Sequence, residues 1–355
     1  MTKRKILGIF RGFPGLGRVV AGVSLLETLS NKYDIETLPI SYLQGNEYLY
    51  SKGYIDLKEA TCRDYCAIGI LPTGAFGYNI HKTIQSFSPD MVLLDGEPLM
   101  VQSIRLSYPN IKIVVLLNPA DVDNPNNDKE AMDYFNFLYS LSDVAIVHGL
   151  KRVHTNYQYK ELISIGTILR EEIFQIRNTP ANDIYCILGG GTINVDNKFT
   201  QSTIRIAELC IHVANQLKGR TMHIACSSKN IYDILAKKVL PTNVVLYDQV
   251  LNAVEYYSKA SLIITRSGRN TLSELAYLGI PAITFVVGDR YRSEEQKQNL
   301  ACLYGTNISS ASPEISDEEF AQLCKKTLET SPLKSNFIPG NNEAINKILS
   351  MLVLQ

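Results

Sequence analysis

Short apolar runs alternate with amphipathic stretches along the first half of the chain. Runs rich in Val, Ile and Leu indicate buried strands, and apolar residues three and four apart indicate a helix over 19–29. A polar, tyrosine-rich stretch at 41–54 predicts an exposed loop or short helices. The apolar runs lie at 5–10, 34–38, 90–94, 112–117 and 143–147. This alternation predicts an α/β fold, a doubly wound parallel sheet whose last strand ends at His148.

The same alternation begins again after a linker at about 166–183. Apolar runs at 184–188, 261–265 and 282–287 indicate buried strands, and the helical period between the last two is closed by Gly279. A final helix is expected at 341–354. The chain therefore predicts two Rossmann-like domains, residues 1–165 and 182–338, followed by a terminal helical segment at 341–355.

Length and composition agree with two folded domains and exclude several classes of protein. A chain of 355 residues exceeds what one core usually serves, and a hydrophobic content of 45% supports well-formed cores. The formal net charge of +0 gives no electrostatic case for binding nucleic acid. No apolar run reaches the ~20 residues of a membrane span. The short apolar run after the basic N-terminus predicts a first strand rather than a signal peptide.

The cysteines indicate the compartment. Seven cysteines, an odd and scattered set, are typical of a reducing environment, so a cytoplasmic protein is expected. Cys62 and Cys66 form the only close pair in the sequence, and a metal site needs more ligands nearby. Core or surface thiols are the preferred interpretation.

The most informative segment is 260–299, in which strand, turn, helix and strand follow one another. Its first strand ends at Arg266, Ser267 and Gly268, and a helix begins at once. The N–H groups at a helix start lack partners within the helix, and the helix dipole favours negative charge there. The turn therefore predicts a phosphate site, although a Ser-Gly turn also serves as an ordinary helix cap.

Polar residues that suit the rest of a nucleotide sugar follow this turn. Glu274 lies two turns into the helix, where a carboxylate either binds the paired hydroxyls of a ribose or faces solvent. After the next strand, Glu295, Gln296 and Asn299 occur at an expected helix start, where acceptor and amide groups can read sugar hydroxyls. Phosphate turn, ribose carboxylate and sugar-reading pair, in this order, predict a nucleotide-sugar site.

This segment resembles the donor-binding half of GT-B glycosyltransferases. It is most similar to family 28, which contains the bacterial enzyme that adds N-acetylglucosamine to lipid-linked peptidoglycan precursors. The family pattern S-G-x-x-T-x-x-E, followed by (D/E/Q)-Q-x-x-N, is matched by Ser267, Gly268, Thr271, Glu274, Glu295, Gln296 and Asn299. The resemblance covers roughly residues 184–305. It implies an N-terminal acceptor domain and a C-terminal donor domain facing a central cleft, with a terminal helix that crosses back.

The resemblance also implies further donor contacts and the course of the reaction. The family has a glycine-rich turn after the first strand of its C-terminal domain, and here that turn begins at Gly189. By itself such a turn is usually only a tight connection. The stretch 244–261 resembles the strand and short helix that cradle the base. Remaining donor-site residues are Gly190, Gly191, Thr192, Val250, Arg266 and Asn270. The family implies a UDP-sugar and inversion at C1.

The glycine-rich loop after the first strand is the first of three candidate loops on the acceptor side. Gly15 and Gly17 belong to this loop, and Arg18 stands where the family often carries a histidine. Arginine stays protonated, so Arg18 cannot be a general base. It either stabilises diphosphate or acceptor charge, or it is a solvated residue of the first helical turn.

The second loop is a D-x-E-P element, Asp95 to Pro98, directly after the strand at 90–94. Carboxylates at the carboxyl end of a parallel strand are well placed to deprotonate a sugar hydroxyl, and burial would raise a pKa. The alternative is that Asp95 or Glu97 caps the following helix. Pro98 favours an extended Glu97, and Asp95, closer to the strand end, is slightly preferred as the base.

The third loop, at 118–123, carries Asp121 and Asp123 in a D-x-D triplet. Metal-dependent GT-A transferases hold Mn²⁺ or Mg²⁺ with such a triplet. Its surroundings of Asn and Pro are typical of a surface loop, so no metal site and no cofactor are predicted. Backbone N–H groups at the phosphate turn are expected to stabilise the diphosphate instead.

The sequence therefore predicts a metal-independent, inverting glycosyltransferase. Its partners are a nucleotide sugar and an acceptor, which is a glycan, a lipid-linked sugar or a small molecule. A nucleotide-sugar hydrolase or 2-epimerase of the same fold is one alternative, and a non-catalytic partner subunit is another, favoured by Arg18. No nucleic acid and no transmembrane segment are expected, and peripheral membrane contact stays open.

Overall fold

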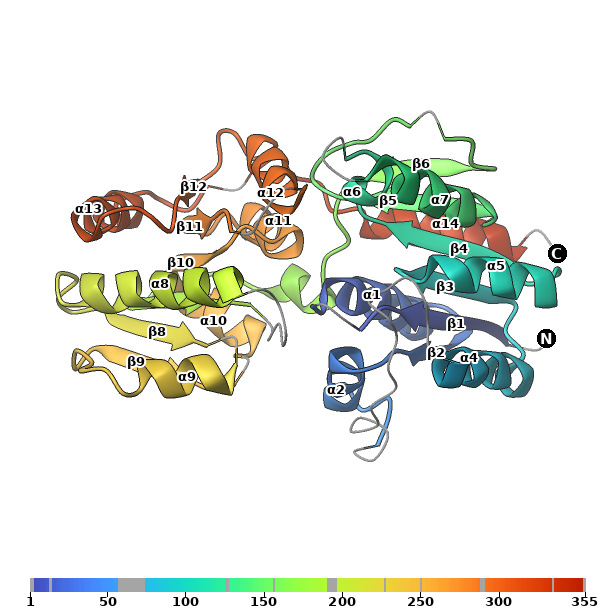
Figure 1. The fold of residues 1–355 in the computed structure, drawn as a ribbon, viewed down its shortest axis with the longest axis horizontal. Helices are drawn as coiled ribbons and strands as arrows, with labels where there is room; N and C mark the ends of the chain where they lie inside the picture. Colours follow the sequence, from blue (N-terminus) through green and yellow to red (C-terminus); the bar gives the residue numbers. More distant parts are fainter. Residues whose placement is uncertain are drawn as a thin grey trace. The chain divides into compact units, whose positions relative to one another are not determined.

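The protein folds into two compact units (Figure 1). Unit 1 comprises Met1–Glu171 and Pro339–Gln355, and unit 2 comprises Glu172–Ile338. Both are built on a parallel sheet, and the described residues give each sheet six strands. The computed structural model describes residues 3–12, 15–56, 74–124, 128–155, 157–189, 197–226, 228–249, 251–287, 291–333 and 335–353.

The sheet of unit 1 has the strand order β2-β1-β3-β4-β5-β6. Its strands are β1 (Arg4–Phe10), β2 (Ile35–Ile40), β3 (Met91–Asp95), β4 (Lys112–Leu117), β5 (Val144–His148) and β6 (Leu162–Ile165). The sequence prediction that the series ends at His148 is wrong, because β6 pairs with β5 beyond it. β6 has only four residues, LISI, so its apolar run is too short to indicate a strand by itself.

The topological switch point of this sheet lies between β1 and β3. From β1 the chain runs outward to β2 on one side and returns to β3 on the other. Phe10 and Asp95 are register partners, so the two strands end at the same level. Ligands of doubly wound sheets bind at the carboxyl ends of strands beside such a point. Candidate chemistry is therefore expected directly after Phe10 and at Asp95.

Helices cover both faces of the sheet of unit 1. On one face, α1 (Gly17–Lys32) and α14 (Asn341–Val353) pack against each other and against one side of the strands. On the other face lie α4 (Gly74–Phe87), α5 (Pro98–Ser107) and α7 (Lys129–Ser140). Along β3, Met91 and Leu93 face the first core and Val92 and Leu94 the second. Burial on both faces explains why these strands read as continuous apolar runs.

The start of α14 is fastened to the segment that leads out of unit 1. The Gly340 N–H donates to the Thr167 carbonyl at 3.1 Å. The buried Asn341 side chain accepts from the Leu169 N–H at 2.9 Å and donates to the Leu169 carbonyl at 2.8 Å. A Cβ at Gly340 would lie 2.1 Å from the Gly166 carbonyl oxygen, so only glycine permits this approach. These contacts place α14 in unit 1.

The sheet of unit 2 has the order β12-β11-β10-β7-β8-β9. Its strands are β7 (Asp183–Ile187), β8 (Thr221–Ala225), β9 (Val244–Tyr247), β10 (Ala260–Arg266), β11 (Ala282–Phe285) and β12 (Ile308–Ala311). Its helices are α8 (Asn197–Ala214), α9 (Lys229–Leu235), α10 (Ala253–Lys259), α11 (Arg269–Leu278), α12 (Tyr291–Ala301) and α13 (Asp317–Leu328). The main core lies beneath α8, α9 and α13. Gly279 ends α11 in the left-handed conformation, φ 72°.

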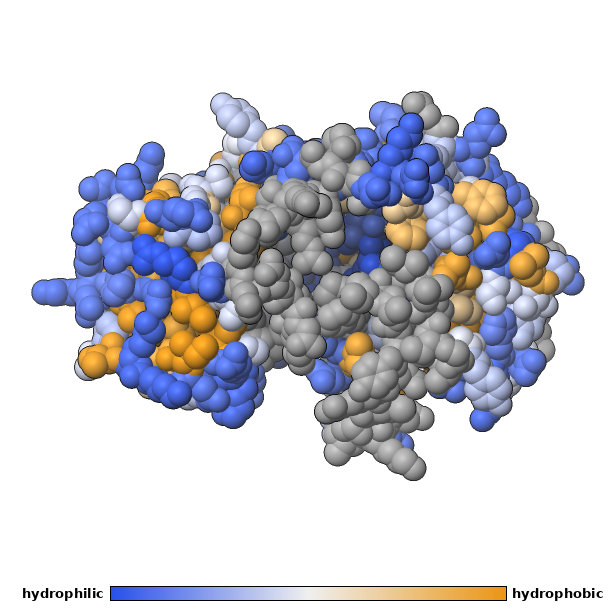
Figure 2. Space-filling model, in the orientation of Figure 1, coloured by the Kyte–Doolittle hydropathy of each residue, from blue (hydrophilic) through white to orange (hydrophobic). Residues whose placement is uncertain are grey.

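The surface of unit 2 seen in Figure 2 is mostly hydrophilic, with apolar side chains gathered between α8 and α9, which contact each other. Shorter elements complete the chain: α2 (Gln44–Ser51), α6 (Pro119–Val122) and a 3-10 turn at Glu171–Gln175 in the predicted linker. Among the described residues, none of the helices combines the length and the apolar character that a membrane span requires.

Candidate functional site

Arg11 joins the carboxyl ends of β1 and β3. Its backbone N–H donates to the Asp95 carbonyl at 2.9 Å, and its guanidinium donates to the Gly96 carbonyl at 2.8 and 2.6 Å. Gly96 has φ +90°, and a Cβ there would lie 2.7 Å from the Arg11 Cβ and 2.8 Å from the Arg18 Cδ. Glycine at position 96 therefore allows two arginines to close over the strand ends.

Arg18, in the first turn of α1, lies between two carboxylates. Its Nη1 pairs with Oδ1 of Asp95, and its Nη2 donates to the two oxygens of Asp121 at 3.0 and 2.9 Å. Burial opposes the charge of Arg18, but Asp121 and Asp95 outweigh it and hold the pKa well above its ordinary value. With its side chain 14% exposed, Arg18 is not the solvated residue of the alternative interpretation.

His148, the last residue of β5, is fully buried beside Asp95. Its Nδ1 accepts from the Ile168 N–H at 3.3 Å, and its Nε2 lies 4.0 Å from Oδ2 of Asp95. Because an accepting ring nitrogen carries no proton, this contact assigns the ring proton to Nε2, facing Asp95. Burial raises the pKa of Asp95, but Arg18 and His148 outweigh it, so the pKa is lowered. Asp95 therefore binds Arg18 through Oδ1, while its Oδ2 lies beside His148 without a hydrogen bond to the described residues.

Glu97 occupies the N-cap position of α5 but caps nothing. Its backbone has φ −121° and ψ 70°, and the side chain makes no capping hydrogen bond. Oε1 accepts from the Tyr42 hydroxyl at 2.6 Å, whereas Oε2 makes no hydrogen bond with the described part of the chain. The capping interpretation is therefore wrong for Glu97, and for Asp95 as well, because the Asp95 side chain binds Arg18.

The pKa values of the two carboxyl groups of the D-x-E-P element are shifted in opposite directions. Burial raises the pKa of Glu97, while the Tyr42 hydrogen bond acts in the opposite direction without cancelling it. A general base works best with a pKa near the working pH and an oxygen open to its substrate. Each carboxyl group has one buried oxygen that makes no hydrogen bond with the described residues, so the pKa distinguishes them: that of Glu97 is raised and that of Asp95 is lowered, which favours Glu97. This order is the reverse of the one expected from the sequence.

The D-x-D triplet lies on a helical turn, so the sequence prediction of a plain loop there is wrong. Asp121 belongs to α6, and Asp123 follows directly. Their carboxylates bind separate cations: Asp121 pairs with Arg18 at 2.9 Å and Asp123 with Lys151 at 2.9 Å. Within the described ranges, no three or more His, Cys, Asp or Glu side chains are grouped as metal ligands.

The turn between β10 and α11 carries the predicted phosphate site. Gly268 is the N-cap residue, with φ −73° and ψ 135°, and no side chain caps the helix. Ser267 is fully buried, its N–H donates to the Phe285 carbonyl at 3.0 Å, and its hydroxyl makes no hydrogen bond with the described residues. Ser267 is therefore not a helix cap. The positive end of the α11 dipole lies at this turn and favours a ligand with negative charge.

Glu274 is buried in α11, with 3% of its surface exposed. Its Oε2 accepts from the hydroxyl of Tyr257, a fully buried residue of α10, at 2.9 Å. The interpretation of Glu274 as a solvated helix residue is therefore wrong. A buried carboxylate requires donors, and Tyr257 supplies one from a neighbouring helix. Thr271, one turn earlier on α11, is half-buried.

The glycine-rich turn after β7 meets the phosphate turn after the adjacent strand β10. Gly189 has φ +100°, and a Cβ there would lie 2.1 Å from Nη2 of Arg266. The guanidinium of Arg266 therefore lies against the backbone of Gly189, and any larger residue would displace it. The other predicted residues of this turn and of the base-cradling stretch lie outside the described residues: Gly190, Gly191, Thr192 and Val250.

The E-Q-x-x-N element lies within α12 and not at its start. The helix begins at Tyr291, so Glu295 and Gln296 belong to its second turn, and the predicted helix start is wrong. The carboxamide of Gln296 accepts from the Val287 N–H at 2.9 Å and donates to the Val287 carbonyl at 2.7 Å. It thereby fixes the segment after β11. Glu295 is half-buried and Asn299 is buried.

The remaining predicted residues lie in the same two regions. Gly15 has φ +85° and donates its N–H to the Gln44 side chain at 3.3 Å, and Gly17 begins α1. Asn270, at the start of α11, accepts from Nε of Arg269 at 3.2 Å.

The tyrosines that contact the two buried glutamates were missed by the sequence analysis. Tyr42 lies in the tyrosine-rich stretch interpreted as exposed, and it is 1% exposed. Tyr257 lies in the stretch expected to cradle the base. The two tyrosines lie 55 and 17 residues from Glu97 and Glu274 along the chain, so no local pattern signals the pairings.

Comparisons with known proteins agree with this geometry. Residues 199–309 match the model of the glycosyltransferase family 28 C-terminal domain. No curated protein matches the chain. The described fold is similar to that of MurG from Acinetobacter baumannii, which is 14% identical with a TM-score of 0.57 over 98% of this chain and 100% of that chain.

Two other solved structures share the fold. Arabidopsis thaliana UGT89C1, complexed with UDP, is 11% identical with a TM-score of 0.66 over 99% of this chain and 100% of that chain. UDP-GlcNAc 2-epimerase from Methanocaldococcus jannaschii is 13% identical with a TM-score of 0.59, covering 99% of this chain and 100% of that chain. The structural likenesses confirm the predicted GT-B fold, and the family match supports a glycosyltransferase that resembles family 28.

Proposed function

We propose that the protein transfers a sugar from a nucleoside diphosphate donor, a UDP-sugar, to an acceptor hydroxyl, with inversion at C1 and without a metal ion. The observation that carries this proposal is the family 28 match over residues 199–309. That range contains both the S-G-x-x-T-x-x-E pattern at 267–274 and the E-Q-x-x-N pattern at 295–299. The choice of UDP follows the same resemblance.

The geometry of unit 2 supports donor binding through the backbone and buried polar groups. The start of α11, which no side chain caps, offers the positive end of the helix dipole to the diphosphate. The hydroxyl of Ser267 lies at the same turn. Charge develops on the diphosphate as its bond to the sugar breaks, and fixed N–H donors stabilise that charge without reorganising. Glu274, held by Tyr257, is the proposed ribose contact.

The geometry of unit 1 supports proton abstraction by Glu97. One carboxylate oxygen of Glu97 accepts from the Tyr42 hydroxyl. The other is buried and makes no hydrogen bond with the described residues, so it has the capacity to accept one from a substrate hydroxyl. In the proposed reaction Glu97 takes the acceptor proton while the acceptor oxygen attacks C1 and the diphosphate leaves. Asp95 neutralises the charge of Arg18 and also lies beside His148. The buried arginine therefore does not need Glu97 as its counter-ion.

The proposal that no metal is required is supported by the ion pairs of the D-x-D triplet. Asp121 and Asp123 are each paired with a basic side chain, Arg18 and Lys151 respectively. Recruiting Asp121 to a cation would take one of its two carboxylate partners from the partly buried Arg18, and recruiting Asp123 would break its pair with Lys151.

The proposal is tested by incubating the protein with a panel of UDP-, GDP- and dTDP-sugars, with and without candidate acceptors, and by quantifying the released nucleotide. Acceptor-dependent release of UDP is the expected result. Calorimetry with UDP alone reports donor binding separately. A protein that binds no nucleoside diphosphate, and releases none with any donor, would overturn the proposal.

The same assay separates the alternatives. A hydrolase releases nucleotide and free sugar at the same rate whether or not an acceptor is present. A 2-epimerase changes the sugar of the donor, which is detected by NMR of the sugar ring protons. A non-catalytic subunit gives none of these signals. Among the similar structures is a UDP-GlcNAc 2-epimerase, but no observation on the described residues favours that activity over transfer.

A further inference from the structure

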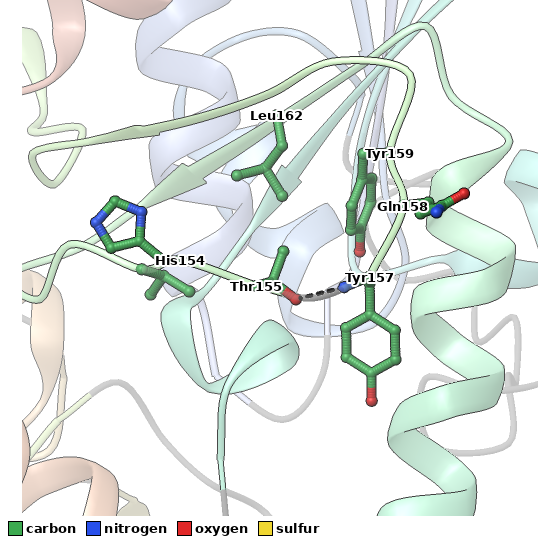
Figure 3. A pocket seen from close by; sticks show the side chains of 7 residues that line it. His154, Thr155, Tyr157, Gln158, Tyr159 and Leu162 are labelled. Carbon is green, nitrogen blue, oxygen red and sulfur yellow. Dashed lines mark hydrogen bonds between the residues drawn. The ribbon is translucent and has the colours of Figure 1, made fainter.

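A pocket of about 430 Å³ is formed in unit 1 by the connection between β5 and β6. Tyr159, Leu162 and Thr155 surround the same space in Figure 3, with the imidazole of His154 at its other side. This volume falls in the range of small-molecule sites, roughly 300–1,000 Å³. No residue of this pocket was used in the proposed transfer of the acceptor proton.

The walls of the pocket are fixed by hydrogen bonds to α7. The Tyr159 hydroxyl donates to the Asn136 side chain at 2.5 Å, and the Tyr157 hydroxyl donates to Asp133 at 2.5 Å. The Tyr157 N–H also donates to the Thr155 hydroxyl at 3.1 Å, the contact drawn in Figure 3. Because the Tyr159 hydroxyl is engaged, this residue offers a ligand the face of its ring in a fixed position.

The chemistry of the lining suits a neutral sugar ring. None of the described side chains that line it carries a fixed charge, so neither a phosphate nor an ammonium group finds a counter-ion. A pyranose combines an apolar face of C–H groups with hydroxyls at its rim. The Tyr159 ring and Leu162 suit the apolar face of the sugar. The imidazole of the exposed His154 can exchange hydrogen bonds with the sugar hydroxyls.

We propose that this pocket binds a neutral pyranose, and that it is the subsite for the acceptor sugar. The contact chain supports the second part. Asn136, which receives the Tyr159 hydroxyl, also donates to the Asp121 carbonyl at 3.1 Å, and the Asp121 carboxylate binds Arg18 at 2.9 Å. The pocket wall is therefore tied to the residues around Asp95. Only the identification of the bound sugar as the acceptor rests on the proposed function, because sugar binding itself does not depend on transfer.

Saturation-transfer difference NMR on the full chain tests this inference. The probes are the methyl glycosides of glucose, galactose, mannose and N-acetylglucosamine, with phenol as an aromatic probe. His154→Ala removes an exposed group, Tyr159→Ala removes the ring, and Tyr159→Phe keeps the ring without its hydroxyl. Lys160→Ala is the matched control, because Lys160 is exposed in the same segment and its side chain binds Asp143.

At least one glycoside is expected to bind with a Kd that UDP does not change. That Kd should rise about fivefold in His154→Ala, the effect of one hydrogen bond. It should rise more than tenfold in Tyr159→Ala, change less than threefold in Tyr159→Phe, and stay unchanged in Lys160→Ala. Retained thermal unfolding temperatures show that the variants are folded.

Several results would overturn the pocket assignment: no glycoside signal at millimolar concentration, phenol binding in place of glycosides, displacement by UDP, or equal affinities in Tyr159→Ala and the unchanged protein. The proposed function can fail separately. Glycoside binding without any nucleotide affinity would leave the sugar pocket standing and remove the transferase proposal.

Discussion

The carboxyl ends of the two sheets carry different chemistry on the same topology. In unit 1 the strand ends hold charged side chains that bind one another: Arg18 lies between Asp95 and Asp121, and Tyr42 binds Glu97. In unit 2 the turn after β10 holds an uncapped helix start, a glycine and a buried serine hydroxyl. One edge supplies groups that gain or lose protons, and the other supplies fixed dipoles.

This difference teaches how one scaffold can serve two halves of a reaction. A general base must be an ionisable side chain. Its burial and its neighbouring groups set its pKa. A leaving diphosphate needs donors that are already oriented and cannot change their charge, which backbone N–H groups at a helix start provide.

Replacing the proposed base is expected to have the largest effect. Glu97→Gln should lower turnover by about 10²–10⁴-fold, because a general base contributes roughly that factor, and should leave UDP affinity unchanged. Asp95→Asn is the matched comparison at the other carboxylate of the same element. Rates near those of the unchanged protein in Glu97→Gln, together with loss in Asp95→Asn, would return the role to Asp95.

Removing the buried carboxylate of unit 2 should act on binding and not on proton transfer. Glu274→Ala should weaken UDP binding by about 1–3 kcal/mol, the scale of lost charge-assisted hydrogen bonds, which is about 5–150-fold in Kd. Calorimetry measures this, with the unfolding temperature recorded beside it, because Glu274 also binds Tyr257. Tyr257→Phe controls for that contact alone. Equal UDP affinity in a folded Glu274→Ala would contradict the ribose contact.

The hydroxyl of Tyr42 should set the pH range of the reaction. Its hydrogen bond favours the charged form of Glu97 and lowers that pKa, so Tyr42→Phe should raise it. Since the base must be deprotonated, the acid limb of kcat/KM against pH should move to higher pH. Tyr48→Phe, another tyrosine of the same region, serves as the control. An acid limb that does not move would mean that Glu97 is not the titrating group.

Metal removal should have no effect at all. EDTA in millimolar excess should leave turnover unchanged, because the proposed diphosphate contacts are backbone N–H groups and not a cation. The measurement compares initial rates before and after EDTA, and after added Mn²⁺ or Mg²⁺. Loss of activity in EDTA that Mn²⁺ restores would contradict diphosphate binding by backbone groups alone. It would also make Asp121 and Asp123 candidate metal ligands.

Local sequence patterns predicted the elements better than their ends. The strands at 112–117 and the helix between the last two strands of the 260–287 segment follow from apolar runs bounded by turn residues. The edge strand β6 was missed, because its apolar run has only four residues. The start of α12 was misplaced, because the polar residues 291–294 gave no apolar period with which to begin the helix.

The apolar pattern and the motif resemblance were sufficient to predict the GT-B fold. Buried parallel strands require continuous apolar runs, and a phosphate-binding turn requires glycine before a helix start. Both features therefore appear as patterns of neighbouring residues. The partners of the two carboxylates could be assigned only from the folded structure. Asp95 and Glu97 are two residues apart, yet Arg18 and His148 bind one and Tyr42 the other. Burial and neighbouring charges set a pKa, and those neighbours come from distant parts of the chain.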